Sequence, residues 1–109
     1  MGLYIINAWK GWTAINIEHV ICPENIEDKL AAKHQVTVRE VRQVLLSQPR
    51  IRFTENGHIP GDDVYVAFGQ TYGGRYLAVF FVYKSGSQTA IIISARDMES
   101  PERRRYGRK

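Results

Sequence analysis

Two arginines stand at the ends of the two most apolar segments of the chain, where they are placed to hold an anion. Arg75 opens the segment 75–83, and Arg96 follows the segment 89–95. In an antiparallel pair the start of one strand lies beside the end of the next, so the two side chains should be near neighbours. Guanidinium groups placed together favour an anion between them, and their fork geometry matches phosphate oxygens. The spacing therefore predicts a phosphate site.

A structural role for the same arginines is the alternative. Carboxylates follow closely in the sequence, so the pair could instead form a salt-bridge cluster with Asp97 or Glu99. Arg96 alone could also pair with Glu102 or with the C-terminus of a helix. Charged clusters are often structural, and the sequence leaves both interpretations open.

The net charge of the protein comes from its C-terminal end. Residues 102–109 contain five Lys or Arg and one acidic residue, whereas residues 1–101 contain ten of each, so the tail accounts for the whole net charge of +4. The run Arg103-Arg104-Arg105 would neutralise phosphates and release counterions, which gives affinity for a polyanion. Basic termini also serve simply to keep proteins in solution.

A second pair of arginines lies on one expected strand. Ile51 and Phe53 alternate with Arg50 and Arg52, so the two guanidinium groups should share the face opposite to the apolar residues. This strip would contact phosphate or a protein partner, or it is an ordinary solvated face.

Two helices are expected before this strand. Asn25 can cap a helix over residues 26–34, because its side-chain oxygen can accept a first-turn amide proton. Thr37 and Glu40 have the spacing of a capping box for a second helix, which Pro49 ends. The short connection between the helices predicts a hairpin or elbow laid across one sheet face.

The other segments are mostly extended. Ile15, Ile17, His19 and Ile21 alternate with other residues, which suits a strand with one buried face. The expected sheet is antiparallel and meandering, with helices before it and a short helix after it, and the fold class is α+β. We expect one domain over residues 1–109. The expected strands span 3–9, 13–22, 50–54, 64–70, 75–83 and 89–95.

Several classes of protein are excluded by composition. The single cysteine, Cys22, cannot form an internal disulfide, and the longest apolar run, 76–83, is much shorter than the roughly 20 residues of a membrane helix. His19 and His58 have no partner at metal-ligand spacing, and no phosphate-binding loop or dinucleotide motif is present, so neither a metal nor a cofactor is expected. We expect a cytoplasmic protein that does not bind membranes.

Four stretches together resemble the BrnT family of bacterial toxins, over about residues 26–107. The C-terminal signature is Ile92-Ile93-Ser94-Ala95-Arg96-Asp97-Met98 followed by Glu102-Arg103-Arg104-Arg105-Tyr106. The stretch Lys33-His34-Gln35-Val36 resembles the family's turn between two helices, although Gln35 replaces a glycine. The segment 69–77 resembles its glycine-rich hairpin. Residues 1–13 have no counterpart and form an extension.

The resemblance implies a RelE-like fold and a metal-independent endoribonuclease that arrests translation. It also implies a ribbon-helix-helix antitoxin, BrnA, that holds the toxin inactive and carries the pair to operator DNA. The alternative is a non-catalytic module that keeps the fold and binds only antitoxin or nucleic acid.

Cleavage of RNA without a metal requires a proton acceptor for the 2′-hydroxyl, a cation for the phosphorane and a donor for the leaving oxygen. Arg96, with Arg75, is the candidate for the charge. His34, Lys33 and Tyr106 are the candidates for proton transfer, although His34 could simply be a hydrogen-bonded helix terminus and Tyr106 a packing anchor. The expected RNA contacts are Arg50, Arg52, Arg103, Arg104 and Arg105.

Overall fold

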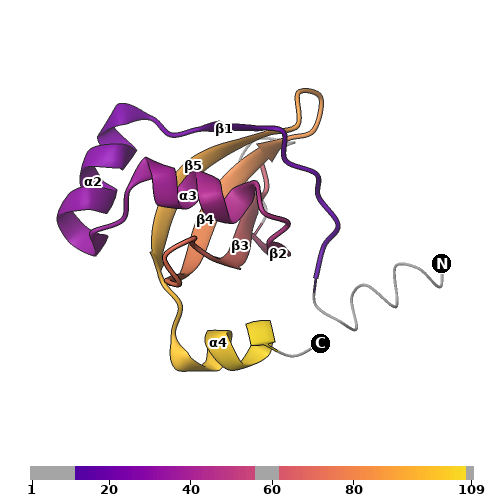
Figure 1. The fold of residues 1–109 in the computed structure, drawn as a ribbon. Helices are drawn as coiled ribbons and strands as arrows, with labels where there is room; N and C mark the ends of the chain where they lie inside the picture. Colours follow the sequence, from indigo (N-terminus) through magenta and orange to yellow (C-terminus); the bar gives the residue numbers. More distant parts are fainter. Residues whose placement is uncertain (1–11, 56–61, 108–109) are drawn as a thin grey trace.

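The computed structural model describes residues 12–55 and 62–107, which form a five-stranded sheet with two helices on one face and a third at its end (Figure 1). The strand order is β1-β5-β4-β3-β2. The expected strand 3–9 and His58 lie outside the described residues. The elements are β1 (His19–Ile21), α2 (Glu24–His34), α3 (Val38–Leu45), β2 (Arg50–Glu55), β3 (Val64–Gln70), β4 (Tyr76–Lys84), β5 (Thr89–Asp97) and α4 (Ser100–Gly107).

The predicted antiparallel meander accounts for β2 to β5, but β1 pairs with β5 in parallel. The sheet is therefore mixed. The cause is that α2 and α3 connect the β1 edge of the sheet to its β2 edge, so the first strand lies beside the last one (Figure 1).

The expected strand over 13–22 is much shorter in the structure, and its predicted buried face is correct for Ile15 and Ile17, which pack in the core, but wrong for His19 and Ile21, which are exposed. Thr13 forms a bridge with Ile51 on the β2 edge, whereas the amide of Glu18 donates to a carbonyl at the start of β5. The segment thus crosses the end of the sheet before it pairs. Because only β1 is a strand, the alternation does not extend along it, and Ile21 is 52% exposed.

The helix α2 begins at Glu24 without the expected cap from Asn25. The carbonyl of Pro23 accepts the amides of Ile26 and Glu27 instead, each at 2.9 Å. Acidic residues in the first turn interact favourably with the helix dipole. A proline start supported by these carboxylates therefore replaces a side-chain cap.

The helix α2 ends at His34 and is followed by Gln35, which adopts the left-handed conformation with φ of 49°. Gln35 stands where the resembled BrnT pattern has glycine, and it accepts a conformation that glycine adopts more easily. The amides of Gln35 and Val36 both donate to the carbonyl of Leu30, the second at 3.1 Å, so an orphan carbonyl of the last turns of the helix is satisfied. Gln35 therefore ends α2 with the same left-handed backbone conformation that a glycine would adopt there.

The predicted capping box of α3 is confirmed. The Glu40 amide donates to the Thr37 hydroxyl at 3.1 Å, and the Thr37 amide donates to the Glu40 carboxylate at 3.0 Å. A side-chain cap of this kind stabilises a helix by about 1 kcal/mol. The box fixes where the elbow between α2 and α3 turns.

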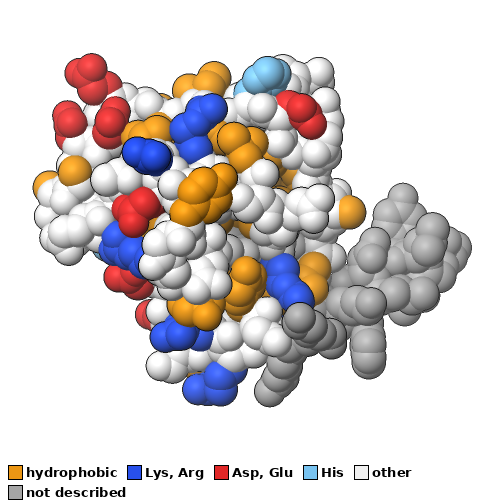
Figure 2. Space-filling view, viewed as in Figure 1, with side chains coloured by type: hydrophobic (Ala, Val, Ile, Leu, Met, Phe, Trp, Pro, Cys, Tyr) orange, Lys and Arg blue, Asp and Glu red, His pale blue; other side chains and the backbone are white. Residues whose placement is uncertain are grey.

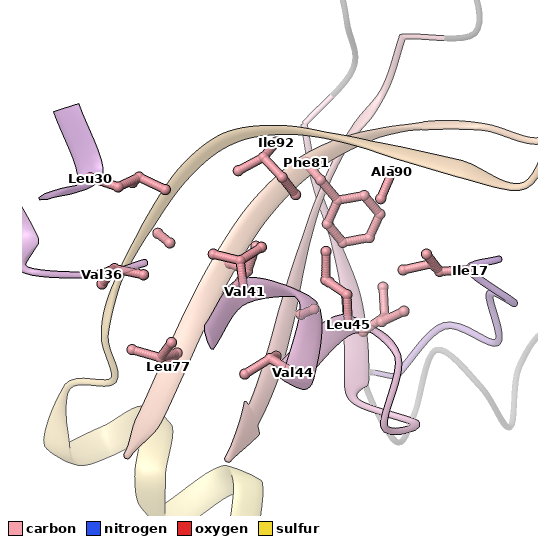
Figure 3. Packing of buried hydrophobic residues seen from close by; sticks show 14 residues of the cluster. Ile17, Leu30, Val36, Val41, Val44, Leu45, Leu77, Phe81, Ala90 and Ile92 are labelled. Carbon is pink, nitrogen blue, oxygen red and sulfur yellow. The ribbon is translucent and has the colours of Figure 1, made fainter. Parts of the chain in front are cut away.

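The face of the sheet beneath α2 and α3 holds the main hydrophobic core, and we call it the core face. Figure 3 shows Val41, Val44 and Leu45 of α3 directed at sheet residues that include Leu77 and Phe81. Gly69 permits this close packing, since a Cβ there would lie 2.8 Å from a methyl group of Val44. The core face fixes the sheet as a rigid support for its other face.

Candidate functional site

The opposite face of the sheet combines arginines with aromatic rings, and side chains of α4 reach it from the end of the sheet. We call it the α4 face. Strand pairing places Arg50, Phe68, Ala78 and Arg96 in one row across β2, β3, β4 and β5. At about 4.8 Å per strand, the backbone positions of the two arginines are roughly 14 Å apart. The core-face residues next to them in sequence point the other way.

The flanking rows extend the same composition. Arg52, Val66 and Phe80 form the row on one side, and Gln70 pairs with Tyr76 on the other side. The predicted strip of Arg50 and Arg52 therefore exists, but both side chains are half-buried among rings instead of fully exposed. Phe53, predicted to point away from these arginines, lies on the edge strand β2 and is 42% exposed.

The helix α4 adds its own cations and a ring to this face. Met98 and the side chain of Tyr106 pack on a small cluster around Phe68. Trp12, which precedes β1, packs on the same cluster and meets Phe68 edge-on at 5.9 Å between ring centroids. The C-terminal helix and a residue from the N-terminal region thus cover one part of the sheet together.

All six cation–π contacts among the described residues lie on the α4 face. Arg50 lies 5.7 Å from the ring centroids of both Trp12 and Tyr106. The shortest contact joins Arg103 to Tyr76 at 4.1 Å. The remaining pairs are Arg52 with Phe68, Arg96 with Phe80, and Arg105 with Trp12.

Arg96 forms a two-pronged ion pair with Glu102 of α4. Its two terminal nitrogens donate to the two carboxylate oxygens at 2.7 and 2.9 Å. The hydrogen bond from Arg96 lowers the pKa of Glu102, and Glu102 in turn raises the pKa of Arg96. Glu102 also accepts the amide of Glu99 at 2.8 Å. This pair fixes the start of α4 to the end of β5.

Arg75 is held on the core face by carbonyl and carboxylate groups. Its guanidinium donates to Asp97 at 2.7 Å, to the carbonyl of His34 at 2.7 Å and to that of Gln35 at 2.6 Å. A further contact reaches Glu40 at 3.4 Å. The hydrogen bond from Arg75 lowers the pKa of Asp97. All three guanidinium nitrogens are engaged, so Arg75 joins the α2–α3 elbow to β5.

The expected convergence of Arg75 and Arg96 is wrong. Both lie at the same end of the sheet, but Arg96 pairs with Ala78, and Arg75 is an odd number of residues away from Ala78. The pleat therefore sends the two side chains to opposite faces. Each binds its own carboxylates, which is the structural alternative that the sequence left open.

The proton-transfer candidates are divided between the same two environments. Lys33 and His34 lie in the last turn of α2, where His34 is half-buried and its charge contributes to lowering the pKa of Asp97. Tyr106 lies on the α4 face, with its ring 6.1 Å from that of Tyr76. The structure groups His34 with Arg75, and Tyr106 with Arg50 and Arg103.

Sequence reasoning missed the aromatic half of the site. Trp12, Phe68, Tyr76 and Phe80 were assigned only to strands or turns, yet each contacts an arginine. The signal was available, because alternation in β2 to β4 assigns every second residue to one face. To use this signal, one must also know the strand register, which decides which residues of neighbouring strands lie side by side on that face.

Charge is unevenly distributed over the molecule. Basic side chains gather over α4 at the lower end of Figure 2, whereas acidic side chains gather over α2 at the upper left. Among the described residues, no three His, Cys, Asp or Glu side chains form a group that could hold a metal ion. Within the same ranges, no helix has the length and apolar content needed to cross a membrane.

Residues 24–102 match the model of a family described as the ribonuclease toxin BrnT of type II toxin–antitoxin systems. The chain belongs to the BrnT family. It is also similar to the crystal structure of the Brucella abortus ribonuclease toxin BrnT, with a TM-score of 0.55 and 21% sequence identity over 80% of this chain and 100% of that one. A search of curated proteins found no match. The predicted family and α+β fold are confirmed.

Membership of the BrnT family gives the molecule its general setting. The protein is a ribonuclease toxin of a type II toxin–antitoxin system, so its target is RNA and its partner is an antitoxin. The α4 face has the composition that such a target requires, because cations bind phosphates and flat rings stack on bases.

Proposed function

We propose that this BrnT toxin is a metal-independent endoribonuclease that binds single-stranded RNA on the α4 face, cleaves it and thereby arrests translation. One observation carries the proposal, which is the interleaving of arginines with aromatic rings on one rigid sheet face. Five arginines contact rings there, namely Arg50, Arg52, Arg96, Arg103 and Arg105.

The ion pairing on this face leaves an excess of positive charge. The carboxylate of Glu102 forms an ion pair with Arg96 and also lies near Arg52, so one negative charge faces two arginines. Arg103, Arg104 and Arg105 are exposed. Phosphates approaching this surface would meet cations that are already held over rings, which limits the entropy lost when they bind.

The proposed chemistry is attack by the 2′-hydroxyl on the adjacent phosphorus, in which the O2′–P bond forms as the P–O5′ bond breaks, leaving a 2′,3′-cyclic phosphate and a 5′-hydroxyl. Arg96 is proposed to stabilise the charge of the phosphorane, since Glu102 fixes its fork in one orientation. Tyr106 is the proposed proton donor on the same face. His34 or Lys33 is the proposed acceptor of the 2′-hydroxyl proton, which requires the RNA strand to pass from the α4 face to the end of α2. Arg75 enters the proposal as the residue that positions this end of α2.

We further propose a BrnA-like ribbon-helix-helix antitoxin as the partner, with operator DNA bound only through that antitoxin. The support is the family, whose members belong to type II toxin–antitoxin systems. An antitoxin that neutralises the toxin would cover the α4 face or hold α4 away from the sheet.

The proposal is tested by incubating purified protein with messenger RNA in the presence and absence of EDTA. We expect cleavage in both, with products that end in a 2′,3′-cyclic phosphate, because no metal takes part. Full-length RNA remaining at stoichiometric protein would refute the nuclease, and loss of cleavage in EDTA would refute metal independence.

Two matched arginine variants then test the residue assignment. Arg96→Ala should lower the cleavage rate by at least about 100-fold, since removal of one charge-stabilising donor has an effect of this size. Arg39→Ala removes an exposed arginine of α3 and should leave the rate unchanged. Expression without antitoxin should be harmless for the first variant and toxic for the second. Equal toxicity of the two would refute the role of Arg96.

A non-catalytic binding module is the second candidate, and one observation favours it. The two arginines expected at the phosphate site are each paired with carboxylates, Arg75 with Asp97 and Arg96 with Glu102. A protein that only binds would retain RNA or antitoxin affinity in the EDTA experiment and yield no cyclic phosphate.

A further inference from the structure

A pocket lies between the hairpin end of the sheet and α4. Its volume is about 470 Å³, within the range of roughly 300 to 1,000 Å³ that is usual for small-molecule sites. The side chains that matter for its chemistry are Gln70, Tyr76, Ser100, Arg103, Arg104 and Tyr106. The pocket is large enough for one nucleotide, and it opens on the α4 face.

Two rings form a corner in this pocket. The centroids of Tyr76 and Tyr106 are 6.1 Å apart, and the ring planes meet at 75°. The guanidinium of Arg103 lies 4.1 Å from the centre of the Tyr76 ring. Unstacked bases bind on aromatic rings and on guanidinium planes of this kind. The corner therefore offers a flat platform and a perpendicular wall to a base.

Gln70 supplies an oriented polar group beside the corner. Its side-chain nitrogen donates to the carbonyl of Gly74 at 3.0 Å, which directs the amide oxygen as an acceptor. Its backbone is paired with Tyr76, so the group is held by the sheet. The hydroxyl of Ser100 is a second polar group, which can donate or accept.

The turn that carries Gln70 is internally braced. The hydroxyl of Thr71 accepts the amide of Arg75 at 3.0 Å, and the side chain of Gln43 accepts the amide of Tyr72 at 3.0 Å. Gly74 adopts φ of 94°, which a side chain would disfavour. A braced turn loses little freedom when a ligand binds, so the acceptor of Gln70 is pre-organised.

We propose that this pocket binds one unstacked nucleotide of single-stranded RNA and sets the sequence preference of the toxin. The base stacks on Arg103 and Tyr76 against Tyr106, and its donor edge meets the oxygen of Gln70 and the hydroxyl of Ser100. Arg104 binds the phosphate of the same nucleotide. The inference rests on the proposed function for its substrate class, and it adds a subsite that reads the base.

Binding is tested separately from cleavage, with a single-stranded RNA oligonucleotide whose 2′-hydroxyls are replaced by fluorine. Tyr106→Leu should weaken binding between about fivefold and about 150-fold, the range for one stacked base. Tyr106→Phe keeps the ring and should bind within twofold of the parent. Equal binding by the Leu variant, the Phe variant and the parent would overturn the subsite, whether or not the parent cleaves RNA.

Specificity is tested on a randomised single-stranded RNA pool, by sequencing the cleavage sites. Gln70→Ala and Ser100→Ala should each reduce the preference at one nucleotide position by about fivefold or more. Asn25→Ala, which removes an exposed amide on α2, is the matched control and should keep the preference.

The outcomes separate the two proposals. A parent that binds the fluorinated RNA through Tyr106 but cleaves nothing refutes the nuclease and retains the subsite. An unchanged preference in both Gln70→Ala and Ser100→Ala overturns the reading of the base. If Tyr106→Leu weakens antitoxin binding but not RNA binding, the pocket is a protein-docking site and the inference is wrong.

Discussion

The two faces of the sheet differ in composition although the same strands build both. On the core face, Leu77, Val79 and Phe81 of β4 are fully buried beneath the helices. On the α4 face of the same strand, Tyr76 and Phe80 remain half-exposed and contact arginines. Because successive residues point to opposite faces, one strand provides stability with one set of residues and recognition with the other.

Two arginines show the same difference. Arg75 points to the core face and donates to two backbone carbonyls as well as to carboxylates. It therefore supplies hydrogen-bond donors for the carbonyl groups of the elbow between α2 and α3. Arg96 points to the α4 face, where it pairs with Glu102 and lies over Phe80. Residue type alone does not distinguish these roles, and the direction of the side chain does.

The largest expected effect is a difference in the free energy of unfolding between variants of two adjacent phenylalanines. Phe81→Ala should lower the free energy of unfolding by about 3 to 5 kcal/mol, because it leaves a cavity in the packed core. Phe80→Ala should cost about 1 to 2 kcal/mol, since its ring is partly exposed. Urea unfolding measures both. Should the first variant fail to fold, Phe81→Leu allows the same comparison with a smaller loss of unfolding free energy.

Arg75→Lys should lower the free energy of unfolding by about 2 kcal/mol. Lysine keeps the charge but cannot donate simultaneously to Asp97 and to the two carbonyls of the elbow. Arg39→Lys on the exposed side of α3 should change stability by less than about 0.5 kcal/mol. A stable Arg75→Lys protein that no longer cleaves RNA would instead give Arg75 a direct part in the chemistry.

Local features of the fold could be predicted from the sequence. The capping box of α3 depends on two residues three positions apart, and no distant contact alters it. The strands 64–70, 75–83 and 89–95 were found because their apolar runs end at turn residues, and each matches an element within two residues. Information within about ten residues was sufficient for these elements.

Long-range pairing could not be predicted in the same way. The sequence placed Arg75 near Arg96 correctly by strand end but not by face, since the face depends on which residues pair across β4 and β5. A bulge between Phe80 and Phe81 shifts that register along the strands. For β1, the polarity of pairing depends on where α2 and α3 return the chain. Strand register and the direction of pairing are thus determined by contacts between residues far apart in the sequence.

A smaller, pH-dependent effect is expected from the ion pair on the α4 face. Glu102 has a lowered pKa in the folded protein because Arg96 donates to it. Its stabilisation is fully present above its ordinary pKa of about 4.3 and is lost as the pH falls through the lower folded value. Glu102→Gln should therefore cost about 1 to 2 kcal/mol at pH 7 and much less near pH 2.

The control for this experiment is Asp97→Asn, on the core face. The Asp97 side chain is 65% exposed, so solvent screening should make its effect at pH 7 smaller than that of Glu102→Gln. Urea unfolding at a series of pH values measures both. A Glu102→Gln deficit that is the same at pH 2 and pH 7 would show that the carboxylate contributes by packing and not by charge.

The smallest effect concerns binding and leaves the fold unchanged. Arg104→Ala should not alter stability, because Arg104 is exposed, but it should remove one phosphate contact. For single-stranded nucleic acid, each contact contributes about 0.7 to the slope of log affinity against log salt concentration. We expect the slope to decrease by about that amount for Arg104→Ala and not at all for Arg39→Ala. Equal slopes for the two variants would show that Arg104 does not contact a phosphate. Only the half-buried arginines of the α4 face would then be left as its phosphate contacts.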